Sequence, residues 1–287
     1  MTPGALSPDE LRERVEACAS TPVDQHLPKD AKVVVDALLT ALETGAVRAA
    51  VENRGRWEAV PWVKRGILLG FRAGELIDMS YGVGRLVSFI DKDTYPIRQF
   101  TPGDGVRLVP GGSSIRRGAF VARGVVCMPP MYINVGAYVD GGTMVDSHAL
   151  VGSCAQIGKR VHLSAAAQIG GVLEPVNASP VVIEDDVLVG GNCGVYEGTV
   201  VRKRAVLAAG VVLTRGTPVF DLVNERVYKG SAESPLEIPE AAVVVPGARA
   251  VKSGWGAAEG LSLQTPMIVK YRDDKTDLAT ALEGWLR

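Results

Sequence analysis

Three side chains could do chemistry on a charged substrate. Asp146 and Glu197 carry carboxylates suited to acid–base catalysis, and Arg107 carries a guanidinium suited to binding an anionic group. A carboxylate can act as a general base that takes a proton from an attacking nucleophile. A planar guanidinium can hold a substrate carboxylate through two parallel hydrogen bonds. By position alone, a surface role suits Asp146 better, and Arg107 suits a surface role and an anchoring role equally. Whether these residues act together depends on the elements that place them.

The composition argues against several classes of function. The 31 Lys and Arg residues nearly balance 32 Asp and Glu residues, and the net charge of −1 gives no reason to expect binding to nucleic acid or an anionic membrane. The four cysteines lie far apart without a CxxC pair, which argues against a disulfide scaffold and a zinc knuckle. The chain starts without a signal-peptide pattern, and no apolar run approaches the ~20 residues that span a bilayer. We therefore expect a cytoplasmic protein with a small ligand.

A six-residue repeat organises the middle of the chain. An apolar residue leads every hexapeptide from 115 to 169, and the period resumes from 183 to 213 after an offset of two residues. Glycine is abundant, and only 6% of the residues are aromatic. The leading residues are Ile115, Val121, Cys127, Ile133, Val139, Val145, Val151, Ile157, Leu163, Ile169, Ile183, Val189, Val195, Val201, Leu207 and Leu213. This pattern is typical of a parallel β-helix built from hexapeptides.

In such a β-helix, three hexapeptides make one coil of ~18 residues. The leading side chains point inward and stack, while small residues turn the corners. About 100 residues then form between five and six coils, each rising ~4.8 Å, in a prism roughly 27 Å long. Segment 171–180 interrupts the period and carries two prolines, so we expect it to leave one corner as a loop that carries function.

The regions on both sides of the repeat differ from it. We expect a helical and mixed domain at 1–104, the β-helix at 105–245 and a C-terminal extension at 246–287. Ser7 with Glu10 predicts a helix start, and a second helix is expected between Asp30 and Gly45. Residues 56–100 predict short strands and turns, residues 217–245 predict closing strands, and residues 278–286 predict a short helix.

Several segments carry a resemblance to one family. They are MVDSHALVGSCAQIG (144–158), IGGVLEP (169–175), GGNCGVYEG (190–198), VRLVP (106–110), TGAVRAA, GILLGFR and GLSLQTPMIVKYRDDKTD (260–277). The chain resembles the tetrahydrodipicolinate N-succinyltransferases over most of its length past residue 40. The resemblance implies a mainly β fold, a left-handed parallel β-helix, assembled as a homotrimer with active sites between subunits. It also implies transfer of succinyl from succinyl-CoA to the amino group of the ring-opened substrate in bacterial lysine and diaminopimelate synthesis.

The resemblance gives roles to the three candidates. Asp146 matches the position of the family's active-site acid, and Arg107 matches the arginine that holds a substrate carboxylate. Asp146 and Glu197 are 51 residues apart, about 2.7 coils or ~13 Å along one prism, so they can act together only across a subunit interface. Some family members carry a further acid where this chain has Gly194, so Glu197 is either an assistant or merely structural.

Spacing gives a hint about the thioester co-substrate. Gly191 and Ala209 are 18 residues apart, which stacks them in one column, and Gly190, Ala208 and Gly216 are expected to extend a strip of small residues. A pantetheine arm can lie along such a strip and pair with exposed backbone groups. Small residues are also what the corners of this fold require, and the sequence alone favours that explanation. The basic residues that could meet CoA phosphates are Lys252, Lys270, Arg202, Lys203 and Arg204.

The histidines argue against a metal centre. The predicted coils hold only His148 and His162, so the three-histidine zinc site found on related β-helices is not easily built, and we expect no metal. His148 is better explained as a partly exposed coil residue than as a base. Two alternative functions remain: a hexapeptide acyltransferase that uses acetyl-CoA, and a nonenzymatic β-helix scaffold or binding protein.

Overall fold

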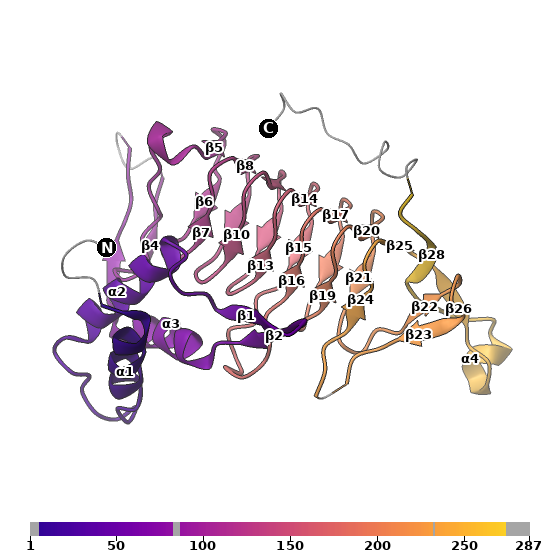
Figure 1. The fold of residues 1–287 in the computed structure, drawn as a ribbon, viewed down its shortest axis with the longest axis horizontal. Coiled ribbons are helices and arrows are strands. Elements are labelled where there is room, and N and C mark those ends of the chain that lie inside the picture. Colours follow the sequence, from indigo (N-terminus) through magenta and orange to yellow (C-terminus); the bar gives the residue numbers. More distant parts are fainter. Residues whose placement is uncertain (1–5, 83–86, 232, 274–287) are drawn as a thin grey trace.

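The computed structural model describes residues 6–82, 87–231 and 233–273 and shows a long three-sided prism with a helical region beside one end (Figure 1). Each coil of the prism contributes one two-residue strand to each of three parallel sheets. The helix predicted at 278–286 lies outside the described residues.

The three sheets are named here in the order in which the chain visits them. Sheet I contains β5 (Arg107–Leu108), β8 (Val126–Cys127), β11 (Met144–Val145), β14 (His162–Leu163), β17 (Leu188–Val189), β20 (Val206–Leu207) and β25 (Ala242–Val245). Sheet II contains β6 (Ser114–Ile115), β9 (Tyr132–Ile133), β12 (Leu150–Val151), β15 (Gln168–Ile169), β18 (Gly194–Val195) and β21 (Val212–Leu213). Sheet III contains β7 (Phe120–Val121), β10 (Tyr138–Val139), β13 (Gln156–Ile157), β16 (Val182–Ile183), β19 (Val200–Val201) and β24 (Glu237–Ile238).

The core of the prism contains the residues that lead each hexapeptide, together with small or aliphatic residues two positions before most of them. Every one of the sixteen predicted leads is buried in a single hydrophobic cluster. They stack in register, as where Val145 is opposite Leu163 and Leu163 is opposite Val189. Because these small and aliphatic side chains fill the core, it needs few aromatic rings, and the stacked parallel strands confirm the expected parallel β-helix.

The corners follow the same six-residue period. A residue with positive φ occurs at Gly136, Gly142, His148, Cys154 and Arg160, each six residues after the one before. Left-handed backbone suits glycine best, which explains part of the glycine content of the repeat. Segment 171–180 leaves the prism between β15 and β16 as the predicted loop.

The N-terminal region packs three helices, α1 (Pro8–Ala19), α2 (Ala31–Glu43) and α3 (Pro61–Ala73), around a second apolar core. Ser7 and Glu10 form the predicted capping box of α1. Asp30 precedes α2, but its side chain makes no cap hydrogen bond and instead pairs with Arg14. The short strands and turns predicted over 56–100 are present, but the segment also contains α3, which begins at Pro61 and buries one face against α1 and α2.

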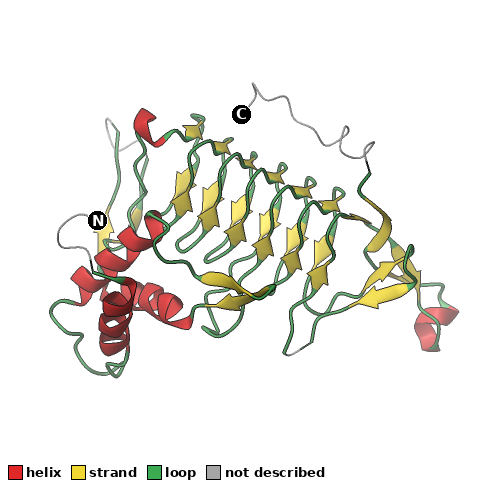
Figure 2. Ribbon diagram, in the orientation of Figure 1, coloured by secondary structure: helices red, strands yellow, loops and turns green. Residues whose placement is uncertain are grey.

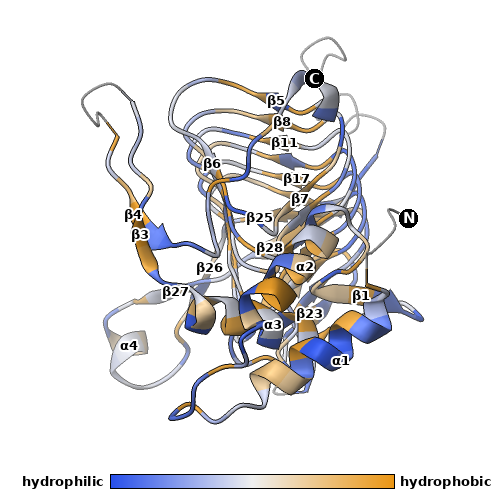
Figure 3. Ribbon diagram, turned by 90° about the vertical axis from the view of Figure 1, so that its left-hand side faces the viewer, coloured by the Kyte–Doolittle hydropathy of each residue, from blue (hydrophilic) through white to orange (hydrophobic). Residues whose placement is uncertain are grey.

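Short strands complete the N-terminal region and dock it on the prism. These are the hairpins β1 (Ala50–Asn53) with β2 (Arg56–Ala59) and β3 (Leu76–Asp78) with β4 (Ile90–Lys92), followed by a 3₁₀ turn at Pro102–Asp104. Arg48 lies 3.7 Å above the Tyr138 ring and donates to Gln156, while Trp57 donates to Glu184. These contacts place the helical region and the β1–β2 hairpin over sheet III, and an end-on view shows the β3–β4 hairpin standing away on the other side (Figure 3).

The C-terminal part lengthens the prism after the period fails at 216. Strands β24 and β25 add a rung to sheets III and I, as expected for closing strands. The remaining elements are β22 (Val219–Asp221), β23 (Arg226–Tyr228), β26 (Ala248–Ala250), α4 (Gly254–Ala258), β27 (Ser262–Gln264) and β28 (Met267–Tyr271) (Figure 2). None of the helices in the described part of the chain has the length and apolar character needed to cross a membrane.

Candidate active site

Asp146 lies at the edge where the chain passes from sheet I to sheet II. It directly follows β11, and its amide donates to Leu163 O of the next coil. The equivalent positions on the following rungs are Ser164, Gly190 and Ala208, whose amides donate to Val189 O, Leu207 O and Val244 O. Asp146 therefore begins a column of small residues that climbs along one edge of the prism.

A second column runs beside the first, one residue further along each coil. It contains Ser147, Ala165, Gly191 and Ala209, linked because Ala166 donates to Ser147 O, Asn192 to Ala165 O and Gly210 to Gly191 O. Gly191 and Ala209 are thus neighbours, as their 18-residue spacing predicts. We call Ser164, Ala165, Gly190, Gly191, Ala208 and Ala209 the small-residue strip.

Gly216 was wrongly expected to extend this strip. It follows β21 in sheet II, so it lies at the edge between sheets II and III. The reason is that Gly216 comes eight residues after Ala208, which is more than one six-residue step, and the chain has already moved to the next side of the prism.

The carboxylate of Asp146 is half-buried and held by its own turn. Its Oδ1 accepts from the Ser147 amide at 2.7 Å, and its Oδ2 lies 4.0 Å from Nε2 of His162. From the sequence, His162 is named only as one of the two coil histidines and is not placed beside Asp146. The 18-residue coil register could have indicated that His162 is near Asp146, because His162 lies directly beside Met144 on the neighbouring strand.

Arg107 lies on the same sheet as Asp146. Its strand β5 pairs with β8, which pairs with β11, so two strand spacings of ~4.8 Å separate Arg107 from the rung of Asp146. The side chain is on the exposed outer side of β5. The structure thus brings a carboxylate, an arginine and the small-residue strip onto one side of the prism.

Glu197 lies elsewhere on the same chain. It follows β18 at the edge between sheets II and III, and its Oε2 accepts from the Arg215 amide at 3.1 Å. Glu197 lines a cavity of about 910 Å³ together with Tyr196, Arg215 and the loop residues Glu174 and Asn177. Asp146 and Glu197 therefore occupy different edges and do not meet within one chain.

Comparison with known proteins places this geometry in a family. A family model described as the N-terminal part of tetrahydrodipicolinate N-succinyltransferase matches residues 11–73, and one described as the hexapeptide repeat of succinyl-transferase matches residues 180–215. A 2,3,4,5-tetrahydropyridine-2,6-dicarboxylate N-succinyltransferase of Polynucleobacter asymbioticus is 39% identical, with 98% of each chain covered. The equally named protein of Nitrobacter winogradskyi is 42% identical, with 93% of this chain and 92% of the relative covered.

The chain belongs to the tetrahydrodipicolinate N-succinyltransferase family. The repeat of this family winds as a left-handed parallel β-helix, and the prism described above is that fold. A further N-succinyltransferase of this name, from Ralstonia nicotianae, is 42% identical over 91% of this chain and 90% of its own length.

The basic residues named from the sequence differ in their availability. Arg202 is bound to Glu184, to Glu237 and to Gly55 O, so it fastens the β1–β2 hairpin and is not free for a phosphate. Lys270 pairs with Asp273 at 3.2 Å. Lys252 is exposed between β26 and α4.

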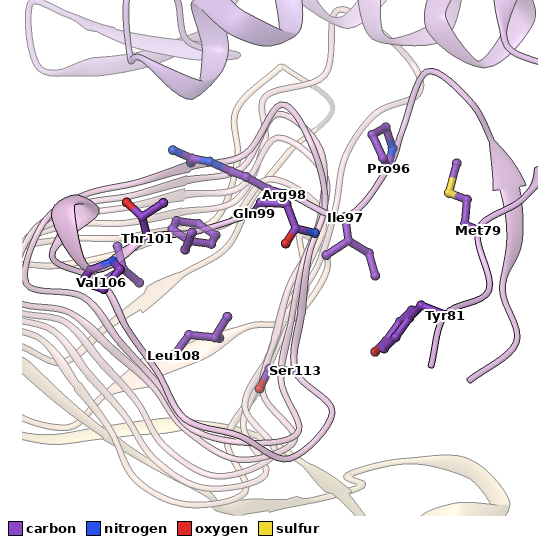
Figure 4. A pocket seen from close by; sticks show the side chains of 12 residues that line it. Met79, Tyr81, Pro96, Ile97, Arg98, Gln99, Thr101, Val106, Leu108 and Ser113 are labelled. Atoms are coloured by element: carbon purple, nitrogen blue, oxygen red, sulfur yellow. The ribbon is translucent and has the colours of Figure 1, made fainter. Parts of the chain in front are cut away.

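A second large cavity, of about 850 Å³, lies between the first coil and the β3–β4 hairpin (Figure 4). Leu108 and Ser113 of the prism face Met79 and Tyr81 of the β3–β4 hairpin across it. Its described lining contains neither a carboxylate nor a histidine, so it offers no group for acid–base chemistry at neutral pH.

The cysteines and the side chains that could bind a metal are the remaining candidates for chemistry. All four cysteines are buried and free, and burial raises the pKa of Cys127 to about 12, so this thiol is not a nucleophile. Within residues 6–82, 87–231 and 233–273, no three His, Cys, Asp or Glu side chains gather as metal ligands would.

Proposed function

We propose that this protein transfers succinyl from succinyl-CoA to the amino group of L-2-amino-6-oxopimelate, the hydrated and ring-opened form of tetrahydrodipicolinate. The products are N-succinyl-2-amino-6-oxopimelate and CoA, a step of lysine and diaminopimelate biosynthesis. The observation that carries the proposal is identity of 39% over nearly the whole of a relative that is named for this reaction. The position of Asp146 at the start of the small-residue strip supports it.

In the proposed reaction, Asp146 acts as the base. The substrate nitrogen attacks the thioester carbonyl carbon, and its proton passes to the carboxylate of Asp146. The carbon–sulfur bond then breaks, and Asp146 returns the proton to the sulfur as the CoA thiol leaves. Arg107, on the same side of the prism, holds one of the two substrate carboxylates. His162 lies beside Asp146 and limits the movement of the Asp146 carboxylate.

Succinyl-CoA is proposed to lie along the small-residue strip. Gly191 and Ala209 have no side chain beyond Cβ, so a pantetheine arm can approach the backbone at successive rungs. Gly190 is two strand spacings, ~10 Å, from Asp146 along the column, and the thioester end of the arm is proposed to face the carboxylate. Lys252 is proposed to contact the CoA phosphates.

A homotrimer would bring Glu197 of one subunit to the Asp146 edge of another. The outer positions of sheet I include the apolar residues Met144 and Leu188, which stay partly exposed within one chain. An apolar outer side of a sheet fits burial against another subunit. In this proposal Glu197 assists Asp146 only across that interface.

The proposal is tested by thiol release from succinyl-CoA and, separately, from acetyl-CoA, each with and without tetrahydrodipicolinate. Release that requires tetrahydrodipicolinate and occurs with succinyl-CoA alone is expected. Thiol release with acetyl-CoA alone would indicate that acetyl-CoA is the acyl donor. No release with either donor would support a scaffold or a different acceptor.

Ala209→Leu is expected to raise the KM for succinyl-CoA at least about tenfold, because a leucine side chain fills the proposed path of pantetheine. Ala209 is exposed, so the fold should keep its thermal stability. Steady-state kinetics with each substrate varied in turn will check this. An unchanged KM for succinyl-CoA would show that the pantetheine arm does not lie along the small-residue strip. Gly216→Leu, which alters another edge of the prism, is the control.

A further inference from the structure

Lys64 of α3 is fully buried, with an exposed fraction of 0%. It is the only lysine or arginine of the described residues that is buried to this degree. Its ammonium donates to the backbone carbonyl of Ala178, 114 residues away in the loop 171–180. No carboxylate of the described residues forms an ion pair with it.

The loop 171–180 is held at both of its ends. At its start, Val172 donates to Ser153 O, and the Leu173 side chain packs against the apolar core of the N-terminal helices. At its end, the Lys64 ammonium holds Ala178. The residues between these anchors include Glu174, Pro175 and Asn177, which line the cavity that contains Glu197.

A buried ammonium without a carboxylate partner is costly, and burial lowers the pKa of Lys64. A methionine of similar length would fill the same space without that cost. The charge is therefore not explained by packing, and its contact with Ala178 is the feature that a methionine could not reproduce.

We propose that Lys64 is a positioning residue that fixes loop 171–180 against the Glu197 cavity, so that α3 sets the shape of that cavity. The inference rests on the proposed function only in its kinetic consequence, because the restraint on the loop exists whatever the substrate is. Lys64 acts through Ala178 and contacts no reacting group.

The test compares Lys64→Met with Arg65→Met in the full-length protein. Arg65 is the next residue of α3, and its removal breaks a partly exposed pair with Glu16 without reaching the loop. We expect Lys64→Met to leave the unfolding temperature unchanged or higher, while amide hydrogen exchange within 172–179 becomes about tenfold faster. Arg65→Met should leave exchange in the loop unchanged.

The kinetic readout is a split between KM and kcat. With Lys64→Met we expect the KM for tetrahydrodipicolinate to rise about tenfold and kcat to change less, since the loop lines the cavity of Glu197, which the proposed trimer brings to the Asp146 edge. Unchanged exchange in the loop, or faster exchange spread equally over α1, α2 and α3, would overturn the proposal. If the methionine variant does not fold, Lys64→Gln serves the same test, because its shorter amide does not reach Ala178.

The two proposals fail in different ways. Wild-type protein that releases no thiol from succinyl-CoA contradicts the proposed function, while hydrogen exchange still reports the restraint on the loop. If the wild-type protein is active but amide exchange in the loop is equally fast in the wild type and the variant, only the role of Lys64 is contradicted.

Discussion

Asp146→Asn is expected to lower kcat by about 10²- to 10⁴-fold, because an amide cannot take the proton of the attacking amine. The KM values should change little, since the amide oxygen can still accept from the Ser147 amide and the shape of the site is kept. Steady-state thiol release with both substrates varied will measure the two parameters. Turnover close to that of wild type would rule out Asp146 as the base.

Asp140 offers a matched control for this variant. Asp140 follows β10 as Asp146 follows β11, and its Oδ1 accepts from the Gly141 amide at 2.7 Å in the same local turn. Asp140→Asn therefore reports the cost of altering such a turn at another edge of the prism. A similar loss of kcat in both variants would assign the effect to the fold and not to proton transfer.

Gly152→Ala is expected to destabilise the protein by about 3 kcal/mol. A Cβ at Gly152 would lie 2.1 Å from the Gly171 nitrogen and 2.6 Å from its Cα, so backbone and not a flexible side chain must move. This close approach occurs where the chain leaves the prism for the loop 171–180. Thermal unfolding at matched protein concentration should show a lower unfolding temperature, by roughly 6–10 °C.

Gly216→Ala is the control for that substitution. Its Cβ would meet nothing within 4 Å, and its φ lies outside the left-handed region, so no destabilisation is expected. An unfolding temperature for Gly152→Ala equal to that of Gly216→Ala would show that the two backbone segments separate easily. The close packing of Gly152 on Gly171 would then not restrain the loop.

The prism could be predicted from the sequence because each strand carries its own signal. One apolar residue in six, with small residues between, is sufficient to place Val145 and Leu163 in the core and in register. Helix α3 was missed although it has a clear apolar face, because its short apolar run at 66–71 is equally compatible with a buried strand. Its two glycines, Gly66 and Gly70, also lower its helix propensity and are there for close contacts with Leu38 and Tyr95.

The candidate site could be predicted only where it follows the coil period. Counting in steps of eighteen places Gly191 beside Ala209, whereas Gly216 does not fall on that count and lies at another edge of the prism. The neighbours His162 and Asp146 are on adjacent rungs, and their contact depends on side-chain direction. Lys64 and Ala178 are 114 residues apart on unlike elements, so no local pattern could join them.

The docking of the N-terminal region on sheet III has a consequence for how the chain folds as it is made. Neighbouring coils pair residues such as Val145 and Leu163, so each rung can form soon after it is synthesised. The β1–β2 hairpin must wait for partners that lie far along the chain, and its Gly55 carbonyl accepts from Arg202, 147 residues later. At about 5–20 residues per second, that wait lasts roughly 7 to 30 s. The first strands to leave the ribosome are thus among the last to reach their native surface.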